Sequence, residues 1–106
     1  MAKLTDHILP NGQTMTEIMG YGGDADFYTV YGLVEELIQP DTQRTTIDSL
    51  CVGGSFRKDG ISIRMSSEGI TDNFSFVYDA RGLSGEDAEK LRSWLGAVAA
   101  ALPERS

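Results

Sequence analysis

The spacing of apolar residues predicts that the chain ends in a helix over residues 84–102. Apolar positions there recur every three or four residues, which places them on one face of a helix. These positions are Ala88, Leu91, Leu95, Val98, Ala99 and Leu102. Ser84 is suited to cap the first turn, because its hydroxyl can accept a hydrogen bond from an unpaired backbone amide.

A second helical pattern covers residues 24–39. Its apolar residues share one face of a helix: Phe27, Val30, Tyr31, Val34, Leu37 and Ile38. Asp24 or Asp26 is expected to cap its start. The aromatic and β-branched residues at 27–31 favour a strand. A strand there, followed by a shorter helix, therefore remains an open alternative.

Between these helices the apolar period changes to two, which predicts three antiparallel strands within residues 47–79. The strands are expected over residues 47–56, 61–66 and 73–79. An Asp-Gly pair at residues 59–60 marks the first turn. The connections are too short for a crossover, so each strand should pair with the next in antiparallel fashion.

The first 23 residues are the least regular part of the chain. Residues 7–9 could form a short strand, and the Pro-Asn-Gly sequence at 10–12 is a strong turn signal. Residues 14–19 fit either a returning strand or a helical turn. We therefore expect an irregular segment or a short hairpin over residues 1–23.

Together these patterns predict a single domain, residues 1–106, with an α+β fold. The expected order is an undetermined N-terminal segment, a helix, a three-stranded antiparallel meander and a second helix. Packing both helices on one face of the sheet buries each apolar face in the fewest layers. The side chains on the other face of the sheet should then be small and rich in hydroxyl groups.

Composition places the chain among globular proteins, with 41% hydrophobic and 24% charged residues. It contains no apolar run of the roughly 20 residues that a membrane-spanning helix needs. A single cysteine, Cys51, cannot form an internal disulfide, and the N-terminus lacks a basic and then apolar leader. We therefore expect a cytoplasmic protein that does not bind membranes.

The net charge of −7 narrows the class of partner. The first 45 residues hold seven acidic and two basic side chains. Nucleic-acid binding needs clustered Lys and Arg, and no such stripe is visible in the sequence. An acidic field speeds encounter with a positively charged partner. The expected partner is therefore a basic protein rather than a nucleic acid.

No catalytic residue, metal ligand or cofactor site is predicted. Cys51 and His7 are the only residues of their kinds and lie in separate segments, so spacing assembles neither a catalytic pair nor a zinc site. Asp24 and Asp26 resemble the start of a calcium loop, but the sixth position lacks the required glycine.

The outer side of the first predicted helix is the favoured partner-binding surface. Tyrosine supplies contact area at low entropic cost, and neighbouring carboxylates steer a basic partner. We call this surface the acidic helix surface. Its predicted members are Tyr21, Asp24, Asp26, Tyr28, Glu35 and Glu36.

Small residues cover the back of the closing helix, and they predict an oligomer face. The residues concerned are Ala97, Ala100 and Ala101. Close approach of a second copy would make a homodimer. High helix propensity alone also accounts for alanine at these positions.

These observations favour a small acidic protein-binding module without enzymatic activity. In size and charge the chain resembles small bacterial immunity proteins, which would imply an inhibitor that neutralises a basic toxin. The helix, three-strand, helix order also resembles part of the secretion-chaperone fold. The alternatives are a small-molecule-binding or enzymatic dimer with a pocket between sheet and helices, and a structural subunit.

Overall fold

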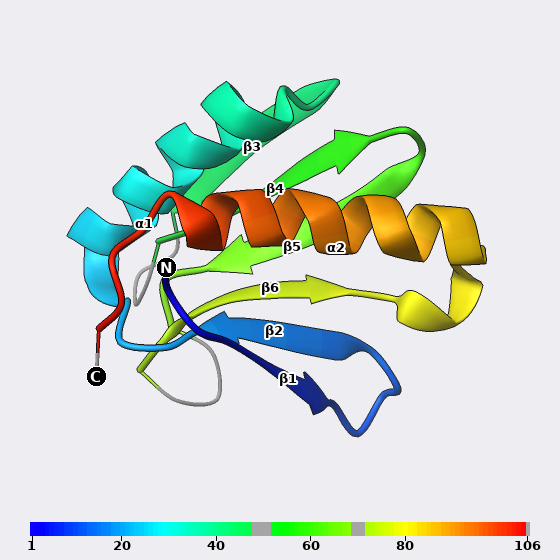
Figure 1. The fold of residues 1–106 in the computed structure, drawn as a ribbon, viewed down its shortest axis with the longest axis horizontal. Helices are drawn as coiled ribbons and strands as arrows, with labels where there is room; N and C mark the ends of the chain where they lie inside the picture. Colours follow the sequence, from blue (N-terminus) through cyan, green and yellow to red (C-terminus); the bar gives the residue numbers. More distant parts are fainter. Residues whose placement is uncertain (48–51, 69–71, 106) are drawn as a thin grey trace.

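The computed structural model describes residues 1–47, 52–68 and 72–105. It is an α+β fold with one six-stranded antiparallel sheet in the order β1-β2-β6-β5-β4-β3 (Figure 1). The strands are β1 (Leu4–Ile8), β2 (Thr14–Ile18), β3 (Thr42–Ile47), β4 (Val52–Lys58), β5 (Ile61–Ser66) and β6 (Phe74–Tyr78). The helical segments are α1 (Gly23–Leu33), the π-helical η1 (Val34–Ile38), the 3₁₀ turn η2 (Ala80–Gly82) and α2 (Gly85–Ala100).

The predicted antiparallel meander is present, because β4 pairs with β5 and β5 pairs with β6. The sheet is larger than expected, since β1, β2 and β3 also belong to it. The N-terminal residues form the hairpin β1–β2, which joins the sheet through pairing of β2 with β6. At the opposite edge, β3 pairs with β4. The strand expected over residues 47–56 is therefore divided, since β3 ends at Ile47 and β4 begins at Val52. Residues 48–51, including Cys51, lie outside the described part of the chain.

The first predicted helix is confirmed, and the alternative of a strand at residues 27–31 was wrong. Helical spacing buries Phe27 and Val30 completely, and this burial outweighs the local strand propensity. The capping prediction is corrected, because Gly22 is the N-cap residue. Asp26 instead accepts a hydrogen bond from the Gly22 backbone nitrogen at 2.9 Å.

The closing helix is also confirmed. α2 begins after Ser84, whose hydroxyl accepts a hydrogen bond from the Asp87 backbone nitrogen at 3.1 Å. The predicted Asp-Gly turn, which lies between β4 and β5, is present as well. Asp59 and Gly60 both have positive φ angles, 52° and 78°, as a two-residue type I′ hairpin requires.

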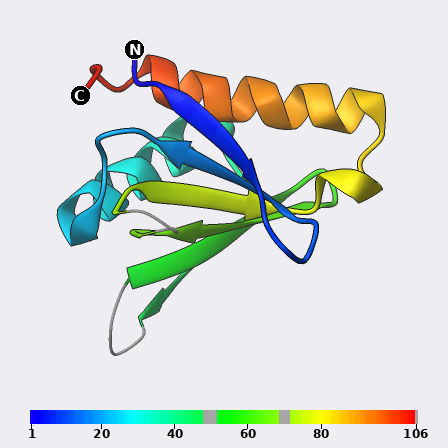
Figure 2. The ribbon, with the colours of Figure 1, turned by 90° about the horizontal axis from the view of Figure 1, so that it is seen from below.

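An aromatic cluster joins α1 to the sheet. The ring centroid of Phe27 on α1 lies 5.7 Å from that of Phe74, and Phe74 lies 5.0 Å from Phe76. All three side chains are fully buried. α1 packs here against β4 and β6, whereas α2 lies on the same side and contacts η1 (Figure 2). We call this side of the sheet the covered face and the opposite side the open face.

The N-cap of α2 gives a direct test of the fold. Replacing Ser84 with Ala should lower the free energy of unfolding by about 1 kcal/mol, because an amide in the first turn loses its acceptor. Ser93→Ala is the matched control, because Ser93 is exposed in the middle of α2. Alanine's helix propensity should make that change neutral or stabilising by up to about 0.5 kcal/mol. Urea unfolding measures both, and equal losses would contradict the cap.

Candidate functional site

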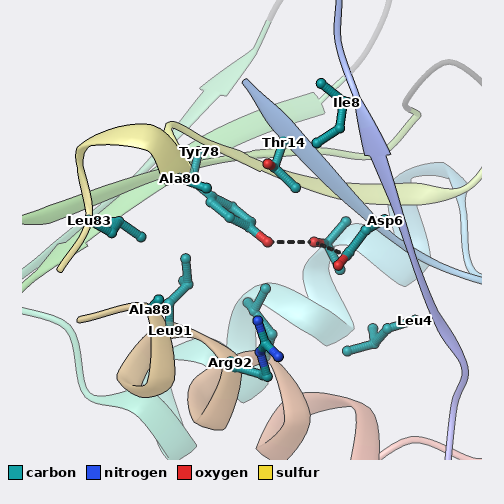
Figure 3. Close-up of a pocket in the computed structure, with 12 residues that line it drawn as sticks. Leu4, Asp6, Ile8, Thr14, Tyr78, Ala80, Leu83, Ala88, Leu91 and Arg92 are labelled. Carbon is teal, nitrogen blue, oxygen red and sulfur yellow. Dashed lines mark hydrogen bonds between the residues drawn. The ribbon is translucent and has the colours of Figure 1, made fainter. Parts of the chain in front are cut away.

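A groove of about 440 Å³ lies between α2 and the covered face of β1, β2 and β6 (Figure 3). Seven of its twelve lining residues are aliphatic, and polar side chains come both from the sheet and, at Arg92, from α2. The lining residues are Leu4, Asp6, Ile8, Thr14, Thr16, Tyr78, Ala80, Leu83, Ala88, Leu91, Arg92 and Leu95. A concave apolar wall with few polar groups is the usual form of a small-molecule site.

Strand register assembles the polar part of the groove. Asp6 on β1 is directly opposite Thr16 on β2. β2 in turn pairs with β6, so that Thr14 is opposite Tyr78 and Thr16 is opposite Phe76. Side chains two residues apart share a face of the sheet. Asp6, Thr16 and Tyr78 therefore all emerge on the covered face, next to α2.

These three side chains form a continuous hydrogen-bonded chain. The Thr16 hydroxyl donates to Asp6 Oδ1 at 2.6 Å, and Thr16 Oγ1 lies 2.9 Å from the Tyr78 hydroxyl oxygen. Thr16 has one hydroxyl proton, which Asp6 receives. Tyr78 must therefore donate to Thr16. The two hydrogen bonds thus run in one direction, from Tyr78 to Thr16 and from Thr16 to Asp6.

The environment of the groove keeps Tyr78 protonated. Burial raises the pKa of Tyr78 above its ordinary value, and the negative charge of Asp6 acts in the same direction. The hydrogen bond with Thr16 and, to a smaller extent, the positive charge of Arg92 oppose this rise in the pKa without cancelling it. Tyr78 is therefore a neutral donor at pH 7, as the direction of the hydrogen-bonded chain requires.

Because both hydrogen bonds run toward Asp6, these three side chains offer the groove acceptors rather than donors. The single protons of Tyr78 and Thr16 are both used in these two hydrogen bonds, so the three groove-lining side chains have only acceptor capacity left. Arg92 supplies donors and a positive charge from the other wall. Figure 3 shows its side chain rising from α2 toward the polar chain.

The structure separates the residues that were predicted to bind a partner. Tyr21 is buried, with 1% of its surface exposed, so it does not contribute to an exposed surface. Its hydroxyl donates to the Pro103 carbonyl oxygen, and the Arg105 guanidinium lies 3.8 Å from its ring centroid. Asp26 also accepts from Arg105 at 2.8 Å. These two residues hold the C-terminal segment in place.

The other members of the acidic helix surface are exposed. Asp24, Glu35 and Glu36 lie on the outer side of α1 and η1, and 49% of the Tyr28 surface is accessible. The predicted oligomer face is exposed too, at Ala97, Ala100 and Ala101. Partner binding by either surface stays a prediction.

His7 does not approach a nucleophile among the described residues. Its Nε2 lies 2.6 Å from Oε1 of Glu17, whose side chain is only 1% exposed, although the two groups are not aligned as a hydrogen bond. Both side chains are on the open face of the β1–β2 hairpin. Within residues 1–47, 52–68 and 72–105, no three His, Cys, Asp or Glu side chains cluster as metal ligands would.

Sequence reasoning missed the groove residues, although one signal was present. Asp6 shares strand parity with Leu4 and Ile8, so a carboxylate lies on the side of β1 that should be apolar. Tyr78, which bonds to the same Thr16 hydroxyl, shares strand parity with Phe74 and Phe76. Nothing in the sequence indicated that Asp6 and Tyr78 are linked through Thr16, because the link depends on the pairing of β2 with both β1 and β6.

The chain matches no protein-family model, and neither a curated protein nor a solved structure shows significant similarity to it. Among the helices of the described residues, none is both long and apolar enough to cross a membrane.

The raised pKa of Tyr78 predicts a late phenol titration. The neutral form is favoured in the folded state, so its contribution to stability is fully present below the unfolded pKa of about 10. That contribution is lost as the pH rises through the folded-state pKa. The absorbance difference at 295 nm between wild type and Tyr78→Phe isolates this residue. We expect its midpoint above that of free tyrosine, and a midpoint at or below it would contradict the buried donor.

Proposed function

We propose that this protein binds a small amphipathic molecule in the groove between α2 and the β1–β2–β6 side of the sheet. The observation that carries the proposal is the series of hydrogen bonds from Tyr78 through Thr16 to Asp6 at the wall of a groove that is otherwise aliphatic except for Thr14 and Arg92. An apolar wall alone would fit many occupants. This series supports one chemistry, since it offers acceptors and has no donor to spare.

The polar end of the ligand should therefore donate hydrogen bonds. An ammonium, amide or hydroxyl group can reach the acceptors around Asp6, and a charged donor makes the stronger bond with a carboxylate. The apolar body of the ligand would lie along Leu83, Leu91 and Leu95. Arg92 lies beside this position and would favour a ligand that also carries an acceptor.

Two probes with the same alkyl chain and opposite head groups test this chemistry. Hexylammonium should shift the NMR signals of the groove residues at lower concentration than hexanoate, because the acceptors of the polar chain require a donor. Asp6→Asn should weaken hexylammonium binding about tenfold through loss of a charge-assisted hydrogen bond.

Asp24→Asn is the matched control, because it removes the same charge from an exposed position on α1. It should leave hexylammonium binding unchanged. Equal weakening by both variants would mean attraction to the overall negative charge. Stronger binding of hexanoate, with signal changes centred on Arg92, would overturn the requirement for a donor.

A second candidate function is the binding of a basic protein by the acidic helix surface, of the immunity or inhibitor kind. The observation in its favour is the side-by-side exposure of large apolar and acidic groups. Tyr28 and Leu37 are two of the exposed large hydrophobic residues, and Glu35 and Glu36 lie beside Leu37 on η1. Apolar anchors among carboxylates suit a positively charged partner.

Charge reversal tests this second candidate. Glu35→Lys with Glu36→Lys should weaken binding of a fluorescein-labelled lysine–alanine peptide about tenfold, since two exposed ion pairs are lost. Fluorescence anisotropy measures the affinity. Glu89→Lys with Glu104→Lys makes the same charge change at exposed positions elsewhere. A comparable loss in that control would exclude a localised site.

A further inference from the structure

Positive charge is concentrated on one half of the sheet of this acidic protein. β3, β4 and β5 contain four basic residues and no acidic residue, within a chain whose net charge is −7. The four are Arg44, Arg57, Lys58 and Arg64. The concentration of basic residues is not evident in the sequence, because acidic residues lie between them along the chain. Only strand pairing brings them together.

Three of these residues share the open face. Arg44 on β3 is opposite Ser55 on β4, and Ser55 is opposite Arg64 on β5. Arg57 lies two residues beyond Ser55 and therefore faces the same side. All three arginines are exposed. Among the described residues, Arg44 and Arg57 make no hydrogen bond or ion pair with another side chain.

β3 is also an edge strand. No described strand pairs with its outer side, and five of its six residues are exposed. An edge strand presents unpaired backbone amides and carbonyls that can accept a further strand. Gln43 ties β3 to the body of the protein, because its side-chain amide donates to the Tyr31 carbonyl at 2.9 Å. Pairing with β4 from Thr42 to Ile47 keeps the strand extended.

We propose that β3 binds an extended acidic segment of a partner protein, which adds to the sheet as a seventh strand. Its backbone would pair with the outer edge of β3. Side chains on the open face would lie beside Arg44, whose planar guanidinium pairs well with carboxylates. Side chains on the covered face would lie beside Ile47, which is 76% exposed. The matching segment thus alternates acidic and apolar residues.

The other edge of the sheet does not offer this chemistry. β1 places the carboxylate of Asp6 on its covered face, and Pro10 follows the strand closely. An inward charge and a proline are both features that discourage strand addition. An acidic segment would also be repelled there. β3 is therefore the better edge, and the acidic side chains of the segment belong beside Arg44 rather than at the Thr42 end, where Glu35 and Asp41 line the adjoining hollow.

A protein segment fits the basic strands better than nucleic acid does. Single-stranded nucleic acid binds through many phosphate contacts and through stacking of bases on aromatic rings. The open side of β3, β4 and β5 offers three arginines, and its other described side chains are Ser and Thr. Those groups suit carboxylates on a flat strand.

The test uses ¹⁵N NMR with two capped peptides, TEVEVET and TKVKVKT. The acidic peptide should shift the amide signals of Thr42–Ile47 and slow their hydrogen exchange. Arg44→Glu should weaken binding of the acidic peptide at least about tenfold and should strengthen binding of the basic peptide. Arg44→Gln, which changes the charge less, should fall between wild type and Arg44→Glu.

Lys90→Glu is the matched control, because it makes the same charge change on α2, where the side chain is 41% exposed. It should leave binding of the acidic peptide within about twofold. Equal weakening by Lys90→Glu and Arg44→Glu would overturn the proposal, as would shifts confined to residues outside β3 and β4.

The same experiment distinguishes two other possible occupants of the β3 edge, a second copy of this protein and a nucleic acid. Protection of the β3 amides that grows with protein concentration, in the absence of peptide, would mean that a second copy occupies the edge. Tighter binding of a twelve-nucleotide thymidine strand than of the acidic peptide would mean a nucleic-acid surface. Either result would overturn the acidic segment as the occupant.

Discussion

The pairing of β2 with β6 is the constraint on which the rest of this structure depends. It joins the N-terminal hairpin to the last strand, with Thr14 opposite Tyr78 and Ile18 opposite Phe74. The same register fixes the polar chain of the groove, since Thr16 must face α2 to contact both Asp6 and Tyr78. A slip of one residue would turn Thr16 to the open face and remove the groove's only continuous hydrogen-bonded chain among the described residues.

Elements encoded by local patterns were predictable from sequence. The period of 3.6 identified both helices, and it correctly outweighed strand propensity at residues 27–31 because Phe27 and Val30 anchor α1 in the core. The Asp-Gly turn between β4 and β5 and the cap at Ser84 were also correct. Each of these signals involves residues close together in the chain, where steric and hydrogen-bond preferences act directly.

Features that depend on distant pairing were not predictable in this way. β3 has the sequence TQRTTI, in which no apolar and polar alternation marks a buried side, because an edge strand with an open face buries little of itself. The groove depends on the β2–β6 register, which local pattern does not encode. The net charge of the whole chain was likewise a poor guide to its local charge. The total is −7, yet β3, β4 and β5 contain no acidic residue.

The groove and the β3 edge can act independently because the sheet separates them. β2 and β3 are four strand spacings apart in the order β2-β6-β5-β4-β3, which corresponds to about 19 Å at roughly 4.8 Å per strand. The groove also opens on the covered face, whereas the arginines face the open side. Substitutions more than about 10 Å apart without shared partners usually have additive effects. The two proposed sites therefore need not exclude each other. Contact between them is indirect, either across the strands or from Gln43 on β3 through α1 and η1 to α2.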